Sequence, residues 1–406
     1  MQSVREDKDV AFVRDPVTFL AYGSLAAFSY CLYALGPILV FLHDELRLSY
    51  TVTSLHSTIW SVGRIVTGLF YARLARRLGR QRLFWLSAAA TASGVLLLAS
   101  SRVVGLTLLT TGLLGTAGTL LQTGTSTVLS DRHGERRDRA LVEANIGASA
   151  AAVLAPVALG FMDGTPAGWR AGLLLPAIGI AVLFLLFGRV QLPIAAPPPE
   201  DGRRRHQFHL EYWMPALLVA TTVGVEFCIV FYGAPLLRSQ TAIRTASAAT
   251  ILSVFFVGGL VGRIIGSQLI RPRGRTVMLV LGALGVTTGG FLALWLSGHL
   301  LYATIGLFIA GLGVANLYPL TLALAVAAAP GRTDQTVARV QLLVGCAVAI
   351  APLSLGALAD HIGVWRAFGI VEPVLIALAL LLLAVCYRPA NRRPIKGGGV
   401  GAGPTG

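Results

Sequence analysis

The sequence predicts an all-α integral membrane protein with twelve transmembrane helices in two pseudo-symmetric six-helix bundles. The prediction rests on the composition, the spacing of apolar runs and an internal repeat. Hydrophobic residues make up 55% of the 406 residues, charged residues make up 13%, and the mean hydropathy is +0.73. Because a soluble protein needs roughly 25% charged residues, lipid must cover much of this chain. A soluble enzyme, a nucleic-acid-binding module and a disordered chain are thereby excluded.

Twelve apolar runs are long enough to cross the hydrocarbon core of a membrane, which takes about 20 residues. Lipid offers the backbone no hydrogen-bond partner, so each run must form a helix. In chain order the predicted helices are 17–42, 52–72, 83–100, 104–130, 140–161, 171–190, 212–236, 248–270, 276–297, 301–328, 337–358 and 367–387.

The longest gap between these runs is rich in proline and arginine and falls after the sixth of them. It divides the chain into five expected parts. These are an N-terminal tail (1–16), an N-terminal half (17–190), a linker (191–211), a C-terminal half (212–387) and a glycine-rich tail (388–406) expected to be disordered.

The basic residues predict the orientation of the chain in the membrane. Of the 33 Lys and Arg residues, 25 lie on the side of both termini and the linker, and six lie on the other side. By the positive-inside rule this places both termini in the cytoplasm. The excess of Arg over Lys, with much Ala, Gly and Leu, is typical of a GC-rich bacterial genome, so we expect a bacterial inner-membrane protein.

An internal repeat relates the two halves with an offset of about 196 residues. A proline, a glycine and a Trp-Arg pair recur in order at Pro156, Gly160 and Trp169, and again at Pro352, Gly356 and Trp365. The segment GRIV (63–66) likewise recurs as GRII (262–265). Dispersed matches in the same order predict two homologous six-helix halves.

These features resemble the major facilitator superfamily over residues 17–387. The segment ARLARRLGRQR (72–82) is similar to the family's loop signature between helices 2 and 3, and SQLIRPRGR (267–275) to its second copy. GLGVANLYPL (311–320) is similar to the family's helix 10, and VGVEFCIVFYGAPLL (223–237) resembles helix 7 of the fucose-permease-like branch. The resemblance implies a central cavity lined by helices 1, 4, 7 and 10, which opens to each side in turn.

The loop signature departs from the family pattern in a way that bears on the cytoplasmic gate. Arginine stands in the acidic slot of both copies, at Arg76 and Arg271. In the family that acidic residue helps to lock the gate, so another carboxylate must serve here. We expect Glu143, at the start of the fifth helix, to pair with Arg271 or Arg273. The predicted gate comprises Arg76, Arg77, Gly79, Arg80, Glu143, Arg271, Gly274 and Arg339, the last being the repeat mate of Glu143.

Glu226 is the strongest candidate for ion coupling. It is the only charged residue between Glu211 and Arg238 and lies near the middle of the seventh helix. Charges inside a membrane are costly and are therefore functional candidates. An apolar environment favours the neutral carboxyl, which can then load and release a proton. The alternative is a permanently protonated side chain that is hydrogen-bonded to Thr222.

Arg64 and Arg263 are paralogous arginines inside the second and eighth helices. A guanidinium remains charged, so each needs an anion, carbonyl groups or water beside it. Binding an anionic substrate group, or acting on Glu226, is one interpretation. Snorkelling to the interface or a structural pair between helices is the other.

Polar residues on the expected cavity helices are candidates for substrate contacts. They are Tyr30 and Tyr33 on one face of the first helix, Gln122 on the fourth, and Asn316 and Tyr318 on the tenth. Ordinary hydrogen bonding between helices is the alternative for each. Asp44 and Glu45 are expected to be solvated on an outer loop, and Glu372 to lie near the outer interface in a structural role.

The function predicted is secondary active transport of a small organic solute, coupled to protons, by a monomer in the lipid bilayer. Uptake of a sugar-like or carboxylate nutrient and export of a drug or metabolite both fit these residues. The chain has no nucleotide, metalloprotease or nucleophile-elbow motif, and its four cysteines lie in apolar runs without metal-ligand spacing. No cofactor, metal or nucleic-acid partner is therefore expected. A polytopic membrane enzyme and a channel are remote alternatives, since acidic–histidine clusters are missing and the repeat opposes a pore between subunits.

Overall fold

The computed structural model describes residues 12–193, 213–269, 276–328 and 333–387, and all of the regular structure in these ranges is helical. The N-terminal half holds α1 (Pro16–Leu46), α2 (Tyr50–Leu78), α3 (Arg80–Ser100), α4 (Val104–His133), η1 (Gly134–Arg136), α5 (Arg137–Asp163), η2 (Trp169–Leu173) and α6 (Leu174–Phe187). The C-terminal half holds α7 (Trp213–Thr241), α8 (Thr245–Ile251), α9 (Ser253–Leu269), α10 (Thr276–Leu296), α11 (Leu300–Ala327), α12 (Thr333–Ile362) and α13 (Val364–Cys386).

The observed helices match the predicted spans, with α8 and α9 forming the eighth and η2 leading into the sixth. Eleven helical segments in the described ranges are long and apolar enough to cross a membrane. The remaining predicted span, α2, has 29 residues, but polar side chains lower its apolarity: Ser54 and Thr58 face α12 in the C-terminal half, and His56 faces α4. The prediction of a twelve-helix membrane fold is confirmed.

Local sequence sets the ends of these helices. The Asp15 carboxylate accepts a hydrogen bond from the Thr18 amide, and Pro16 occupies the first turn, so α1 begins there. Gly79 alone separates α2 from α3 and has a φ of 77°, a conformation that disfavours residues with a Cβ. The glycine of the loop signature is therefore required by the tight connection.

Small residues allow close helix packing at equivalent places in the two halves. A Cβ on Gly115 of α4 would lie 2.3 Å from the Trp60 carbonyl oxygen, and one on Gly311 of α11 would lie 2.0 Å from the Phe255 carbonyl oxygen. Such approaches are possible only for glycine. The contacts between α2 and α4 thus recur between α9 and α11, as the repeat predicts.

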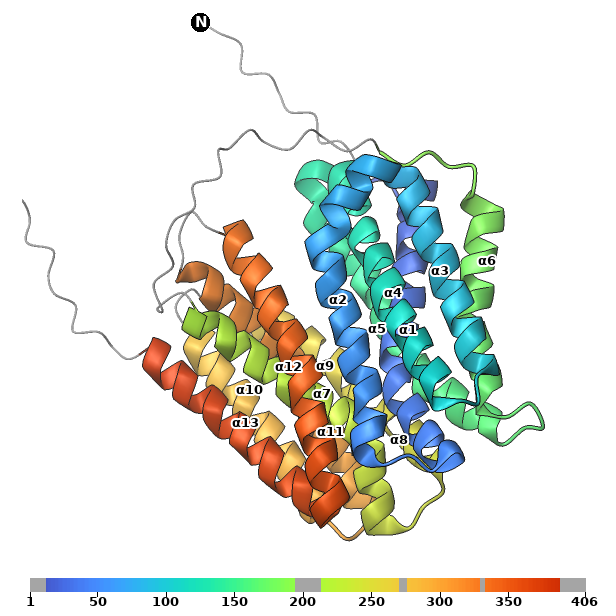
Figure 1. The fold of residues 1–406 in the computed structure, drawn as a ribbon. Coiled ribbons are helices and arrows are strands. Elements are labelled where there is room, and N and C mark those ends of the chain that lie inside the picture. The colour runs from blue at the N-terminus through green and yellow to red at the C-terminus, as the bar shows by residue number, and fades with distance from the viewer. Residues whose placement is uncertain (1–11, 194–212, 270–275, 329–332, 388–406) are drawn as a thin grey trace, which may run out of the picture.

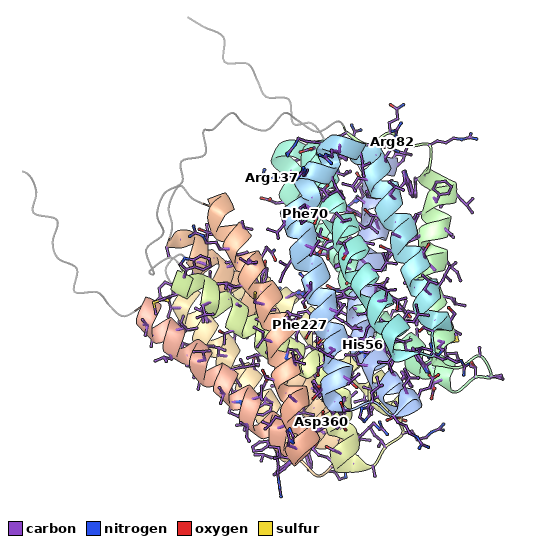
Figure 2. All side chains as sticks on the ribbon, in the orientation of Figure 1. His56, Phe70, Arg82, Arg137, Phe227 and Asp360 are labelled. Atoms are coloured by element: carbon purple, nitrogen blue, oxygen red, sulfur yellow. The ribbon has the colours of Figure 1, made fainter. Side chains whose placement is uncertain are left out.

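The two halves meet at one end of the molecule and diverge toward the other. Figure 1 shows that α1 begins, α6 ends, α7 begins and α13 ends toward the divergent end, which we call the open end. The opposite, closed end carries the connections α1–α2 and α7–α8. Across the seam α2 packs on α12, α5 on α8 and α9, and α1 on α7. Figure 2 places Asp360 at the closed end, and Arg82 and Arg137 at the open end.

Candidate functional site

A cavity lies between the two halves in the middle of the molecule. One compartment is lined by α1, α4 and α5 together with α7, α9 and α11. A second compartment of about 530 Å³ is lined by α2, α4 and α12. Gln122 of α4 lines both compartments, which makes them parts of one central space.

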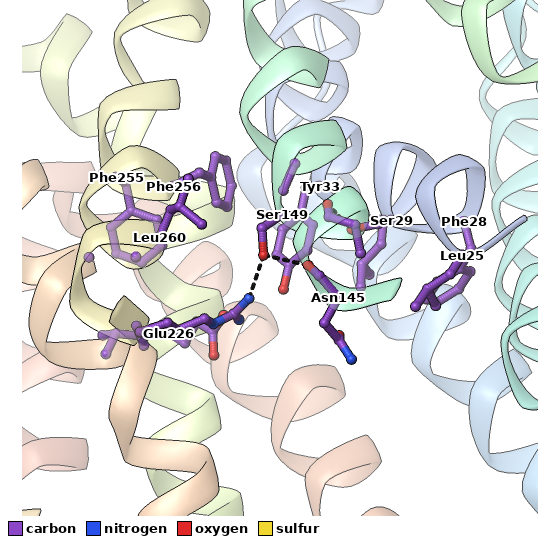
Figure 3. Close-up of a pocket in the computed structure, with 18 of the residues that line it drawn as sticks. Leu25, Phe28, Ser29, Tyr33, Asn145, Ser149, Glu226, Phe255, Phe256 and Leu260 are labelled. Carbon is purple, nitrogen blue, oxygen red and sulfur yellow. Dashed lines mark hydrogen bonds between the residues drawn. The ribbon is translucent and has the colours of Figure 1, made fainter. Parts of the chain in front are cut away.

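Ionisable side chains from both halves face the first compartment (Figure 3). Glu226 reaches it from α7, Arg263 from α9 and Tyr33 from α1. The Arg263 guanidinium donates a hydrogen bond across the seam to the Ser149 hydroxyl, at 2.8 Å from Nη1 to Oγ. Ser149 in turn donates to the Asn145 carbonyl oxygen at 2.8 Å. A neutral hydroxyl leaves the positive charge of Arg263 uncompensated.

Arg64 lines the second compartment from α2. Its guanidinium is close enough to the side chains of Tyr33, Tyr318 and Glu226 for electrostatic interaction with them. Within the described ranges Arg64 makes neither a hydrogen bond nor an ion pair, and Glu226 forms no ion pair with Arg64 or Arg263. The central space therefore holds two guanidinium groups, and the one carboxyl among them lies beyond ion-pair distance.

The structure brings only some of the predicted cavity residues together. Tyr33 and Gln122 line the cavity, and Tyr318 lies beside it, accepting a hydrogen bond from Gln341 at 3.2 Å. Tyr30 is instead buried against its own half, where its hydroxyl donates to the Gly172 carbonyl oxygen at 2.7 Å. Its position on α1 is rotated away from Tyr33 toward α5 and η2.

Asn316 lies on the side of α11 that faces α9 rather than in the cavity. Its amide donates to the Gly262 carbonyl oxygen at 2.8 Å, and a Cβ on Gly266 would clash with it. The asparagine fills the groove left by the glycines of α9, which is the interhelical role weighed as its alternative. Thr222 also behaves structurally, because its hydroxyl donates to the Val219 carbonyl oxygen and not to Glu226.

Sequence reasoning missed several polar groups of the cavity. Ser149, Asn145 and Gln341 line it and were not selected. The repeat contained a signal for two of them, since Asn145 and Gln341 occupy equivalent positions in the two halves. Ser149 lies one helical turn beyond Asn145 and so shares its face of α5.

At the open end, Glu143 pairs within its own half. It accepts hydrogen bonds from the Arg14 guanidinium at 2.8 Å, from the Tyr22 hydroxyl at 3.0 Å and from Arg139 at 3.2 Å. Arg271, the expected partner, lies outside the described residues. Because the halves are apart at this end, the pairing predicted for a closed gate stays a prediction.

The other predicted gate residues lie on both sides of the open end. Arg76 and Arg77 are exposed on the last turn of α2, and Arg80 pairs with Asp131 at 2.6 Å. Arg339 lies over the Trp213 ring at 5.2 Å. Gly274 lies outside the described residues.

The closed end is held by carboxylates that sequence reasoning did not select. Asp44 was expected to be solvated, but it pairs with Arg238 at 2.8 Å and accepts a hydrogen bond from Thr245, both in the other half. Glu45 pairs with Arg170 at 3.0 Å within its own half. Both carboxylates thus have specific cationic partners.

Asp360 of α12 binds the first turn of α2 across the seam. Its carboxylate accepts from the Tyr50 amide at 2.7 Å, from the Thr51 amide at 2.9 Å and from the Thr51 hydroxyl at 2.6 Å. Deeper in the same seam the Thr58 hydroxyl donates to the Ala349 carbonyl oxygen at 2.8 Å. These hydrogen bonds between the halves lie at the closed end or in the middle of the molecule.

The comparisons with known proteins agree with this architecture. The model of the Major Facilitator Superfamily matches residues 18–304 and again residues 216–403. The chain belongs to the major facilitator superfamily. It is therefore a multi-pass membrane transporter and not an enzyme. The first match extends from α1 into α11, and the second covers the described part of the C-terminal half.

Solved structures of other transporters share the fold. A bacterial homologue of the human lysosomal transporter Spinster, inward-facing and unoccupied, has a TM-score of 0.70 at 13% identity over 91% of this chain and 94% of its own. The peptide transporter POT in complex with sulfate has 0.72 at 18% over 91% and 94%. The nucleoside transporter NupG has 0.69 at 12% over 91% and 98%. A search among curated proteins returned no match.

Proposed function

We propose that this transporter carries a small organic anion together with protons. The observation that supports the proposal is the charge of the central cavity, where Arg64 and Arg263 lack a carboxylate partner within ion-pair distance. Arg64 is half-buried and Arg263 is exposed, and both charges lie between the halves of a membrane protein, where an anion stabilises them; a carboxylate or phosphate matches the fork of donors of a guanidinium. The apolar side chains Phe255 and Phe256 beside them suit the organic part of such a solute.

Protons and the anion should bind together. When Glu226 is ionised, its charge partly compensates Arg64 and Arg263, as the mutual interaction of the three charges indicates. Protonation of Glu226 removes this compensation and strengthens the attraction of both guanidinium groups for a substrate anion. By linkage, the bound anion then favours the protonated carboxyl to the same extent. This reciprocity favours symport over exchange of protons for substrate.

The test measures the uptake of candidate substrates by proteoliposomes that contain the protein. The candidates are short organic carboxylates, organic phosphates, neutral sugars and lipophilic cations. With the medium outside acidified, we expect accumulation of at least one carboxylate or phosphate. Efflux of a lipophilic cation driven by the same gradient, with no anion transported, would contradict the proposal and favour a drug exporter.

Arginine replacements should weaken substrate binding rather than turnover. A hydrogen bond to a charged group contributes about 1.5–3 kcal/mol, so Arg263→Gln and Arg64→Gln should each raise KM roughly tenfold or more. Arg366→Gln, at an exposed position on α13 of the closed end, is the matched control and should leave KM unchanged. An unchanged KM in both cavity variants, measured in the same uptake assay, would place these arginines in a structural role.

We further propose that the open end is cytoplasmic, as the distribution of basic residues predicts. The closed end would then face the periplasm, and the structure would represent an inward-open state. Reporter fusions at residue 200 and at the C-terminus should both give a cytoplasmic signal. A fusion after Gly298, between α10 and α11, should give a periplasmic one. The reverse pattern would invert the assignment.

A further inference from the structure

Glu372 of α13 is a buried carboxyl that the proposed transport cycle does not use. Its side chain has no solvent exposure, and neither carboxyl oxygen has a hydrogen-bond partner within the described residues. A carboxylate without a partner or water is strongly disfavoured in such a place. Glu372 therefore holds a proton in this conformation.

Polar groups on one face of α7 lie between the level of Glu372 and the closed end. Cys228, also fully buried, lies one turn after Gly224, where an added Cβ would be 3.8 Å from Leu375 of α13, three residues beyond Glu372. Tyr232 follows Cys228 by four residues and so lies above it on the same helical face. The Tyr232 hydroxyl bonds to the Ser54 hydroxyl and donates to the Tyr50 carbonyl oxygen at 3.2 Å. Thiol and phenol groups can both donate and accept a proton.

Tyr232 also lines a separate cavity at the closed end. This cavity of about 350 Å³ lies between α1, α2 and α7. The charged and titratable groups around it are His43 and Asp44 from α1, Tyr50 from α2, Tyr232 and Arg238 from α7, and Asp360 from α12 beyond Tyr50. The polar lining is suited to water, which can exchange protons with the tyrosine.

The two carboxyls near α7 are on opposite sides of that helix. Residues 226 and 228 are two positions apart, which turns their side chains about 200° from each other. Glu226 accordingly faces the central cavity, while Cys228 lies on the face of α7 that packs on α13. Glu226 and Glu372 therefore lie on opposite sides of α7.

We propose that Glu372 is a second proton-binding site, which exchanges its proton with the closed-end cavity through Cys228 and Tyr232. In the closed state the Ser54 and Tyr50 contacts hold the Tyr232 hydroxyl, and the carboxyl stays protonated. When the closed end opens, these contacts break, water reaches Tyr232, and the proton passes from the carboxyl through the thiol and the phenol to that water. The reverse transfer reloads the site. This inference stands independently of the role proposed for Glu226.

Infrared difference spectroscopy of the full-length protein in lipid, with pH steps in the buffer, tests the site. We expect carbonyl bands of two titrating carboxylic acids in the wild-type protein. Glu372→Gln should remove one band and retain the other, and Glu226→Gln should do the converse. If the Glu372→Gln difference spectrum is identical to that of the wild type, the carboxyl is permanently protonated and the proposal fails. If only the Glu226→Gln spectrum matches that of the wild type, the proposed role of Glu226 in transport fails and the proposal for Glu372 stands.

The route is tested by hydrogen–deuterium exchange of the Glu372 band. Tyr232→Phe and Cys228→Ala should each slow this exchange several-fold without removing the band. Tyr387→Phe is the matched control, since it removes a buried tyrosine hydroxyl at the open end, far from the route, and should leave the rate unchanged. Unchanged exchange in both route variants would overturn the proposal, even if Glu372→Gln does not fold.

Discussion

Glu226→Gln is expected to abolish accumulation of the substrate against its gradient while leaving exchange of substrate across the membrane intact. Glutamine has the shape of the protonated carboxyl, so the variant stays in the state that binds the anion but cannot release a proton. Counterflow with labelled substrate should persist, and its rate should lose its dependence on pH. The measurement is uptake by proteoliposomes with and without a pH gradient.

The control for this variant is Glu45→Gln, which neutralises a carboxylate at the closed end outside the central cavity. It should accumulate substrate like the wild type. Concentrative transport that survives in Glu226→Gln would return this carboxyl to a structural role and leave proton coupling to another group.

Most of the fold could be predicted because membrane insertion imposes strong and simple constraints. The length of each apolar run sets a span, and the basic residues divide by side. The positions shared by Pro156 and Pro352, or by Gly115 and Gly311, reveal the two halves. The span that stands out is α2, whose polar face packs on α12 along the seam between the halves.

The cavity was predicted in part, because sequence identifies a buried polar residue more easily than the direction in which it points. In the apolar stretches of α1 and α7, 89% and 83% of the residues are buried. Neither helix therefore has a solvent-facing or lipid-facing side from which the direction of its other side chains could be predicted. Tyr30 and Tyr33 therefore seemed equivalent, although only Tyr33 faces the cavity. Glu226 was selected for ion coupling because it is alone in a long apolar run; the structure places it on the cavity, and its role in coupling stays a prediction.

The contacts at the closed end could not be predicted, because they join residues that are far apart in the chain. Asp44 pairs with a residue almost two hundred positions away, and Asp360 with α2 in the other half. Each carboxylate lies near a helix end, where the sequence pattern is typical of solvated turns. These side chains find their partners only when the two halves pack against each other.

The last expectation concerns the Asp360 contact, which should decide how readily the closed end opens. Its carboxylate accepts three hydrogen bonds from the first turn of α2, where the backbone amides lack partners within their own helix and favour a negative charge. Hydrogen bonds to a charged group contribute about 1.5–3 kcal/mol each. Asp360→Ala should therefore shift the equilibrium at least tenfold toward a state open at this end, since about 1.4 kcal/mol corresponds to a factor of ten. The Asp44–Arg238 pair remains in that variant, so Asp44→Ala added to it should shift the equilibrium further.

The shift can be measured as the distance distribution between spin labels at Arg102 and Arg366, exposed positions of the two halves at the closed end. Asp163→Ala is the matched control. Asp163 occupies the corresponding end of α5 in the repeat, and within the described residues it binds nothing across the seam. We expect a longer distance to gain population in Asp360→Ala and not in Asp163→Ala. Identical distributions in these two variants would show that the carboxylate caps α2 without holding the halves together, and the closed state would then depend on the packing of α2 against α12.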